Sequence, residues 1–344
     1  MPGHLKPNLI PGRPWDSATS DGPLTFIIGA PRSGTTWLAK ILDSHPDVLY
    51  RHEPDLTVKG CPLPSVCDQA DYGSLAAPAR AFVDRLIAAR DLKSVGSLPV
   101  FRKSFDRPLG RAARVAAVLG VRLADRYLGL PGLRTMQLPE FHDPKHTTPR
   151  HVVIKSVSAL GRAGLLADAL PHARFIFLVR FPMGQIASRY VGVSTGRFRP
   201  FQFDPALLLT PQAVQLGVTA RAIEQATMVE QMAWEWAILN QKASDDLSGR
   251  ANVRTVQYAD LVEDPLPRAR EVLHFAGLDW NDACESFLRR SVEFRGPDSY
   301  FQVYRQGTGS LTKWRGVLSG DDQNRIARIV SATQVGRSGP EQFA

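Results

Sequence analysis

Short apolar runs recur along the chain, and each ends at a turn or a charged residue. Runs of this length that are rich in Ile, Val and Phe are typical of buried strands. Between them lie longer stretches with apolar residues at helical spacing, as at Trp37, Leu38, Ile41 and Leu42. Alternating strands and helices predict an α/β fold with a doubly wound parallel sheet flanked by helices. The expected strands cover residues 24–28, 48–50, 151–155, 174–179 and 253–256.

The helical patterns vary in strength along the chain. Residues 211–242 predict one long helix, whereas residues 286–309 carry few regular signals. The stretch 56–150 interrupts the alternation with punctuating prolines and glycines and two helical patterns. We expect it to be an insertion beside the active site.

The turn after the first strand carries the first candidate chemistry. Gly29 and Gly34 keep the spacing of a P-loop, but Thr35 stands where a P-loop has its lysine. The cation of the loop is Arg32, and the hydroxyls of Thr35 and Thr36 follow it. A strand, a glycine turn and a helix bring backbone N–H groups together on a phosphate. The sequence therefore predicts a P-loop-like site for a single terminal phosphate.

Four candidate residues come directly after predicted strands. They are Gly29, Glu53, Lys155 and Arg180. Ligands of doubly wound sheets bind beyond the carboxyl ends of the strands, so the fold is expected to gather these residues. Arg180 ends a buried strand at the position where a Walker B strand would end in aspartate. This difference argues against hydrolysis of a Mg²⁺-bound nucleotide.

Composition and charge narrow the class of partner. The net charge of +9 favours anionic partners, but the basic residues are dispersed and form no nucleic-acid motif, so no nucleic acid is expected. The three cysteines and the histidines show no zinc spacing, and no metal is expected. The first 22 residues lack the continuous apolar core of a signal peptide or membrane anchor, which favours a soluble cytoplasmic protein.

Several ordered motifs resemble those of sulfotransferases that use 3′-phosphoadenylyl sulfate (PAPS), closest to the Golgi-type protein-tyrosine and carbohydrate enzymes. They are APRSGTTW at residues 30–37, ILDSHPDV followed by HEP, FIFLVRFPMGQIAS at 175–188, the stretch 253–280, and GSLTKWRGVLSGD at 309–321. Together they span residues 24 to about 330. Two positions depart from the family pattern: Phe181 replaces the usual aspartate, and Val157 stands where cytosolic enzymes carry a histidine.

The resemblance implies a role for each candidate. Glu53 would be the general base, with His52 in reserve, and Arg32 and Lys155 would stabilise the leaving 5′-phosphate. Arg180 and Ser188, eight residues apart, would hold the 3′-phosphate. The acceptor would be a hydroxyl group of a carbohydrate, a tyrosine or a small molecule. The remaining donor contacts implied are Ser33, Gly34, Thr35, Thr36, Trp37, Tyr258, Lys313 and Arg315.

The expected organisation is an irregular arm at 1–22, one sulfotransferase domain at 23–335 and a tail at 336–344. Within the domain, 56–150 would form an acceptor-side cap and 300–320 a loop covering the nucleotide. Two alternatives stay open at this point: a nucleoside or sugar kinase, and a nucleotide-binding module that has lost catalysis. A homodimer also stays open.

Overall fold

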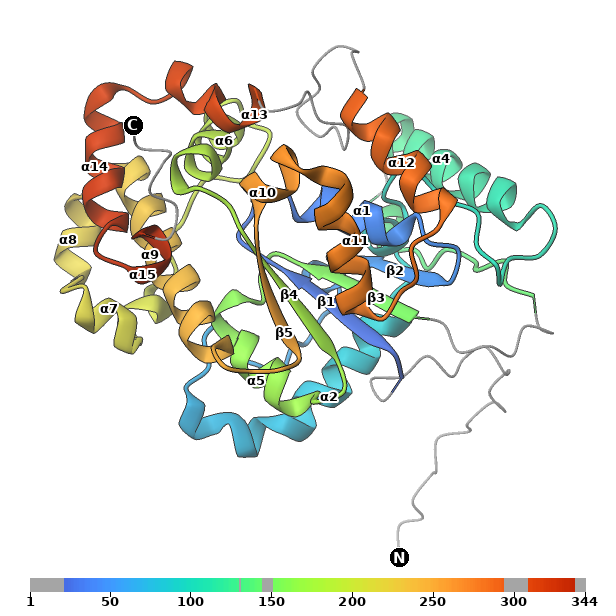
Figure 1. Cartoon of the computed structure of the whole chain (residues 1–344), viewed down its shortest axis with the longest axis horizontal. Coiled ribbons are helices and arrows are strands. Elements are labelled where there is room, and N and C mark those ends of the chain that lie inside the picture. Colours follow the sequence, from blue (N-terminus) through green and yellow to red (C-terminus); the bar gives the residue numbers. More distant parts are fainter. Residues whose placement is uncertain (1–21, 130, 144–150, 294–308, 338–344) are drawn as a thin grey trace, which may run out of the picture.

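Five parallel strands form one sheet in the part of the chain that the computed structural model describes, which is residues 22–129, 131–143, 151–293 and 309–337. The spatial order is β2-β3-β1-β4-β5 (Figure 1). The five strands expected from the apolar runs are all present, with bounds that differ by at most two residues. They are β1 (Leu24–Ile28), β2 (Val48–His52), β3 (His151–Ser156), β4 (Arg174–Val179) and β5 (Val253–Gln257).

The register aligns the carboxyl ends of all five strands along one edge of the sheet. Ile28 of β1 lies opposite Ser156 of β3, and His52 of β2 lies opposite Lys155 of β3. On the other side, Val179 of β4 lies opposite Gln257 of β5. The chain passes over β1 when it goes from β3 to β4, so β1 is where the winding reverses. This is the position at which doubly wound sheets bind ligands.

Both faces of the sheet are buried under helices (Figure 1). Alternate residues of a strand point to opposite faces, so Phe26 packs in one cluster and Ile27 in the other. Phe26 stacks on Phe175 at 5.2 Å between ring centroids. One face is covered by α1 (Thr35–Asp43), α10 (Tyr258–Glu263), α11 (Pro265–Ala276) and α12 (Asp282–Glu293), and the other by α2 (Tyr72–Ala88), α5 (Ala163–Ala169), α6 (Pro182–Ser194), α9 (Met228–Leu247) and α14 (Gly320–Val330). The predicted α/β class is confirmed.

Two helix predictions were wrong. The expected single helix over 211–242 is three helices: α7 (Pro211–Gln215), α8 (Ala220–Gln225) and α9. Thr219 and Thr227 start new helices by accepting backbone N–H bonds, and Thr227 forms a reciprocal capping box with Glu230. The stretch said to lack regular signals contains most of α12, whose buried stripe includes Cys284, Phe287 and Leu288.

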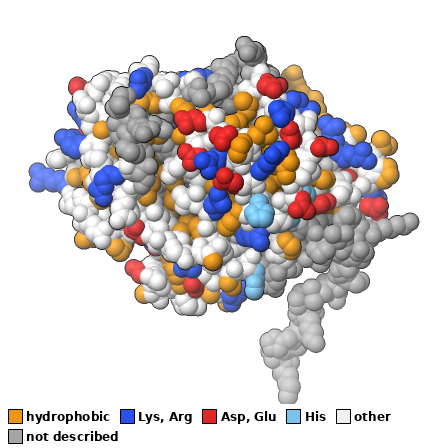
Figure 2. Space-filling model, in the orientation of Figure 1, with side chains coloured by type: hydrophobic (Ala, Val, Ile, Leu, Met, Phe, Trp, Pro, Cys, Tyr) orange, Lys and Arg blue, Asp and Glu red, His pale blue; other side chains and the backbone are white. Residues whose placement is uncertain are grey.

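The segment between β2 and β3 contains α2, α3 (Leu92–Val95) and α4 (Gly110–Leu128). Its assignment as an acceptor-side cap stays a prediction. Parts of three expected segments lie outside the described residues. These parts are residues 1–21 of the arm, residues 300–308 of the covering loop and residues 338–344 of the tail. No described helix has the length and apolar character needed to cross a bilayer. Figure 2 shows Lys and Arg side chains on one face of the molecule interspersed with acidic ones.

Two buried lysines fasten the insertion to α1 through one carboxylate. Lys40 donates to Asp43 Oδ2 at 2.7 Å and also to the carbonyls of Ser97 (2.7 Å) and Pro99 (3.0 Å). All three of its N–H bonds therefore have acceptors. The carbonyls belong to the insertion, so this lysine joins the insertion to the helix that follows the glycine loop.

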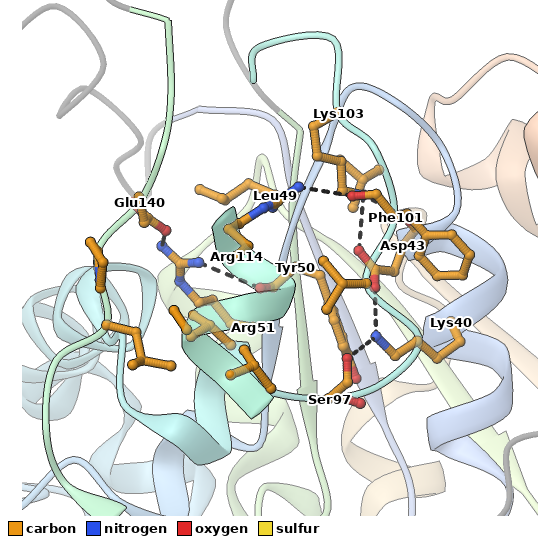
Figure 3. A pocket seen from close by; sticks show the side chains of 17 residues that line it. Lys40, Asp43, Leu49, Tyr50, Arg51, Ser97, Phe101, Lys103, Arg114 and Glu140 are labelled. Atoms are coloured by element: carbon orange, nitrogen blue, oxygen red, sulfur yellow. Dashed lines mark hydrogen bonds and ion pairs between the residues drawn. The ribbon is translucent and has the colours of Figure 1, made fainter. Parts of the chain in front are cut away.

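Lys103 approaches the same carboxylate from the opposite side, and the two lysines border a small cavity of about 50 Å³ beside β2 (Figure 3). It donates to Asp43 Oδ1 at 2.9 Å, to the Asp43 carbonyl and to the His45 carbonyl at 3.1 Å. On the far wall, Arg51 pairs with Glu140 at 2.7 Å. The buried lysines of this cavity wall have all their hydrogen bonds satisfied within the protein, which gives them a structural role.

Asp43→Ala is expected to destabilise the protein strongly, because two buried ammonium groups would lose their shared counter-charge. Breaking a buried ion pair by removing one partner costs about 3–5 kcal/mol. Denaturant titration would measure the loss in free energy of unfolding. Asp125→Ala is the matched control, since Asp125 pairs with the 72%-exposed Arg134 and should cost at most about 1 kcal/mol. Similar losses in the two variants would contradict the role given to Asp43.

Candidate active site

The glycine loop is shaped by two close approaches that leave no room for a side chain. A Cβ on Gly29 would lie 2.6 Å from the carbonyl oxygen of Leu178, and one on Gly34 would lie 2.5 Å from the ring of Tyr258. Gly34 also has a φ of 97°, in the left-handed region that favours glycine. Ser33, buried, donates its hydroxyl to the Ala30 carbonyl at 2.7 Å. The loop is thus fixed by its own packing against β4 and α10.

The N-terminus of α1 suits an anion. Its N-cap is Gly34, which offers no side-chain acceptor, and its first turn contains no acidic residue. The first N–H groups of a helix have no acceptors within the helix, and the helix dipole favours negative charge there. Thr35 and Thr36 provide hydroxyls at the same place, with Thr35 buried and Thr36 half-buried. The expected phosphate contacts are therefore located together.

Arg32 and Ser188 are brought together by the fold. Arg32 Nε donates to Ser188 Oγ at 3.0 Å, although the two residues are 156 positions apart. Arg32 has a φ of 73°, uncommon for a residue with a side chain. Its backbone carbonyl accepts from Arg180 Nη1 at 2.8 Å. The loop of β1, the end of β4 and helix α6 thus meet at one point.

Arg180 also connects this point to the C-terminal segment. Its guanidinium lies 4.8 Å from the ring centroid of Tyr258 and donates to the Ser310 carbonyl at 3.3 Å. Trp37 packs edge-on against the same tyrosine at 6.4 Å and donates its indole N–H to Ser291 at 3.0 Å. Trp37 is fully buried, so in this structure it supports Tyr258 from behind.

Lys313 and Arg315 lie in a short 3₁₀ helix, Lys313–Gly316, and both are exposed. Between them, Trp314 is buried and lies 5.9 Å from the ring of Phe181. Phe181 is the residue that replaces the aspartate usual in the resembled family. Its contact with Trp314 gives it a packing role, holding the Lys313–Gly316 segment against the start of α6.

Glu53 directly follows β2, which is the strand at the opposite edge of the sheet from β5. Its φ of 49° turns the chain away from the sheet, and its backbone N–H donates to the Lys155 carbonyl at 2.8 Å. The side chain is buried and forms ion pairs with Lys155 through Oε1 and with Lys93 through Oε2, the latter at 2.5 Å. The sequence predicted Glu53 and Lys155 at one edge of the sheet, and the structure places them in contact.

The charges around Glu53 set its protonation. Burial acts to raise the pKa of the Glu53 carboxyl, but the neighbouring ammonium groups of Lys155 and Lys93 outweigh it and lower the pKa to about 2. Burial lowers the pKa of Lys155, and Glu53 opposes that shift. Burial and then Lys155 hold the pKa of His52 well below its usual value, and its Nδ1 lies 2.7 Å from the Tyr50 hydroxyl. His52 is therefore a neutral imidazole in this state.

Lys93 and Ser310 were missed by sequence reasoning. Asp91 precedes Lys93 in a helix N-cap pattern that could have predicted the short helix α3. Nothing in that pattern indicates that Lys93 reaches a carboxylate forty residues earlier. Ser310 lies in a motif that the sequence singled out for Lys313 and Arg315, but its contact with Arg180 is made through a backbone carbonyl.

The parallel sheet and the arrangement at its carboxyl edge define an α/β protein with a P-loop-like turn. Over residues 23–282, most of its length, the chain matches the sulfotransferase family. The protein therefore belongs to the sulfotransferase family and is a transferase.

Individual relatives are distant. Carbohydrate sulfotransferase 1 of Danio rerio is 22% identical over 340 residues, covering 86% of this chain and 73% of that protein. A mouse sulfotransferase, SULT7A1, solved in complex with PAP, is 12% identical with a TM-score of 0.46, over 95% of this chain and 91% of the other. A sulfotransferase from Alicyclobacillus acidocaldarius is 17% identical with a TM-score of 0.41, over 92% and 94% of the two chains.

Proposed function

We propose that this sulfotransferase moves the sulfuryl group of PAPS to a hydroxyl acceptor, with the donor lying along the carboxyl edge of the sheet. The observation that carries this proposal is that a candidate residue lies within one position of the carboxyl end of every strand. In spatial order these are Glu53, Lys155, the loop from Gly29, Arg180 and Tyr258. Neighbouring strands are about 4.8 Å apart, so Glu53 and Arg180 are separated by roughly 14 Å. That span suits a nucleotide with phosphates at both ends.

Lys155 supports the placement of the phosphosulfate. An ammonium group can donate three hydrogen bonds, yet in the described structure Glu53 is the one acceptor of this buried lysine. Lys40 and Lys103, equally buried, each have three acceptors. We infer that the remaining capacity of Lys155 serves the leaving 5′-phosphate, together with Arg32 and the N-terminus of α1.

The chemistry follows from this layout. The acceptor oxygen forms a bond to sulfur while the bond from sulfur to the 5′-phosphate oxygen breaks, and the electron pair stays on the phosphate. The acceptor proton passes to Glu53. As in phosphoryl transfer, positioning and electrostatic stabilisation supply most of the rate. Arg180 and Ser188 would hold the 3′-phosphate, and Lys313 and Arg315 would approach it from the exposed segment. No metal has a role in this scheme.

The insertion 56–150 is proposed to border the acceptor. Its support is Lys93 of α3, which reaches Glu53, the residue that must contact the acceptor hydroxyl.

The two alternative functions, a kinase and a module without catalysis, have weaker support. A kinase would need the P-loop lysine that Thr35 replaces and an acidic residue where Arg180 ends β4. A module without catalysis would have no need of a buried carboxylate and lysine in contact at the strand ends.

Donor binding is the first test of the proposal. We expect 3′-phosphoadenosine 5′-phosphate (the bisphosphate) to raise thermal stability without any divalent metal, by about 2.7 kcal/mol at a hundredfold excess over Kd. ATP with Mg²⁺ should stabilise the protein much less. Thermal unfolding followed by calorimetry would measure both, and equal stabilisation by the two ligands would contradict a PAPS site. Incubation with ³⁵S-labelled PAPS and a panel of glycans, tyrosyl peptides, lipids and phenols would then identify the acceptor class.

Arg180→Ala is expected to weaken binding of the bisphosphate by about 1.5–3 kcal/mol, the cost of one hydrogen bond to a charged group. AMP, which lacks the 3′-phosphate, should lose much less, as measured by isothermal titration calorimetry. Arg174→Ala is the matched control, because Arg174 begins the same strand at the opposite edge and donates to the Phe275 carbonyl. An equal loss for both ligands would show that Arg180 does not contact the 3′-phosphate.

Glu53→Gln should lower turnover by about 10²–10⁴-fold with bisphosphate affinity nearly unchanged, because the amide keeps the shape but cannot accept the proton. Rates at saturating donor and acceptor would measure the loss. Asp55→Asn is the matched control: Asp55 lies two residues away and accepts a hydrogen bond from Ser156 at 2.5 Å. Turnover above about a tenth of wild type in Glu53→Gln would reject Glu53 as the base and direct the search to His52.

A further inference from the structure

Glu53 is held by a different lysine at each carboxylate oxygen. Oε1 pairs with Lys155 of β3, and Oε2 pairs with Lys93 of α3 at 2.5 Å. Lys155 belongs to the row of strand ends proposed to bind the donor. Lys93 has no place in that row, since it comes from the insertion between β2 and β3. Its presence on the carboxylate requires a separate explanation.

The position of Lys93 is built into the fold by Asp91. This buried carboxylate caps α3 by accepting from the backbone N–H groups of Lys93 (2.9 Å) and Ser94 (3.2 Å). Its other oxygen accepts from the hydroxyl of Thr57 at 2.9 Å. Thr57 closes the 3₁₀ turn that directly follows Glu53. One carboxylate therefore ties the helix that carries Lys93 to the turn that follows the base.

The two lysines differ in their access to solvent. The side chain of Lys155 is 2% exposed and that of Lys93 is 42% exposed. Moving the Lys93 ammonium from Glu53 into water costs less than moving that of Lys155, because the Lys93 side chain is already partly solvated. Moving Lys155 would require a new anionic partner inside the protein. The Oε2 side of Glu53 is thus the side that an incoming hydroxyl can reach.

We propose that Lys93 is a positioning residue that holds Oε2 of Glu53 until the acceptor hydroxyl replaces its ammonium group. This inference rests on the proposed function, in which Glu53 is the base and Lys155 turns to the donor. While the site is empty, the carboxylate is fixed and fully ionised. Arrival of the acceptor removes one cation from the carboxylate at the moment when a proton must be accepted.

The groups around Glu53 give this exchange its direction. The titratable side chains that influence it are His52 and Tyr50 of β2, Lys155 of β3 and Lys93 of α3, with Asp55 beyond Lys155. With Lys155 bound to the leaving phosphate, Lys93 is the remaining ammonium against the carboxylate. Its departure must raise the pKa of Glu53, because an opposite charge in contact holds a carboxyl pKa down by about 1–3 units. A higher pKa makes the carboxylate a better proton acceptor at neutral pH.

The test is a titration of Glu53 in the complex with the bisphosphate. Protein labelled with [δ-¹³C]glutamate would report the carboxyl by NMR, and the Glu53→Gln variant would assign its signal. In Lys93→Met the pKa of Glu53 should be about 1–3 units higher than in wild type. Lys93→Arg, which keeps the charge, should restore the wild-type value. Lys59→Met is the matched control, since Lys59 is an exposed lysine of the same region that forms no ion pair with Glu53.

Kinetics provide the second measurement. The assay would use an acceptor identified with ³⁵S-labelled PAPS. In Lys93→Met, the acidic limb of the pH profile of kcat/KM should move to higher pH by the same amount as the pKa of Glu53. An unchanged titration and an unchanged limb in Lys93→Met would overturn the inference. So would a variant that only melts earlier, because that is the behaviour of a structural brace.

The outcomes also separate this inference from the proposed function. If wild-type protein does not bind the bisphosphate, the proposed donor site fails and the inference about Lys93 fails with it. If the bisphosphate binds and Glu53→Gln abolishes turnover, but Lys93→Met leaves the pKa of Glu53 unchanged, only the inference about Lys93 is wrong.

Discussion

The parallel register of the sheet is the constraint on which the rest of the structure depends. A parallel sheet must be covered on both faces. Two buried hydrophobic clusters provide this cover, one containing Phe26 and the other, on the opposite face, containing Ile27. Once all five strands run the same way, their carboxyl ends lie on one edge, and five separate stretches of sequence contribute to one row. The glycine loop then only has to hold its backbone close to β4 and to Tyr258, which the missing side chains of Gly29 and Gly34 permit.

Two clusters of two lysines and one carboxylate lie near α1 and β2, and they show how similar charges acquire different roles. Around Asp43, both lysines have three acceptors each, and carbonyl groups complete the set. That cluster is saturated, and it fastens the insertion to α1. Around Glu53, the described structure supplies no carbonyl acceptor to either lysine. Buried donors without acceptors are costly, so we expect a ligand to complete the hydrogen bonds of the buried Lys155.

Much of this arrangement could be predicted from the sequence, because it depends on local patterns. The apolar runs predicted all five strands, and Gly29, Glu53, Lys155 and Arg180 lie at the strand ends that the pattern indicated. The break of residues 211–242 into α7, α8 and α9 was missed because the prediction followed the apolar spacing and passed over the helix-start signals at Thr219 and Thr227, residues that favour an N-cap over a helix interior. Lys93 was missed for a different reason. Its contact with Glu53 depends on how the insertion folds back, and the insertion carries no recurring motif.

The two ends of the strand row differ in how far they are organised before any ligand arrives. At the Arg180 end, the guanidinium is already fixed by the Arg32 carbonyl, the Ser310 carbonyl and the Tyr258 ring. A donor binding there finds its contacts in place, which lowers the entropic cost of ordering side chains. At the Glu53 end, the charged groups are paired with one another, and the proposed reaction requires them to exchange partners. In the proposed mechanism, binding energy gained at the organised end drives the exchange at the other end, because Lys155 would leave Glu53 only when the phosphate of the donor replaces it.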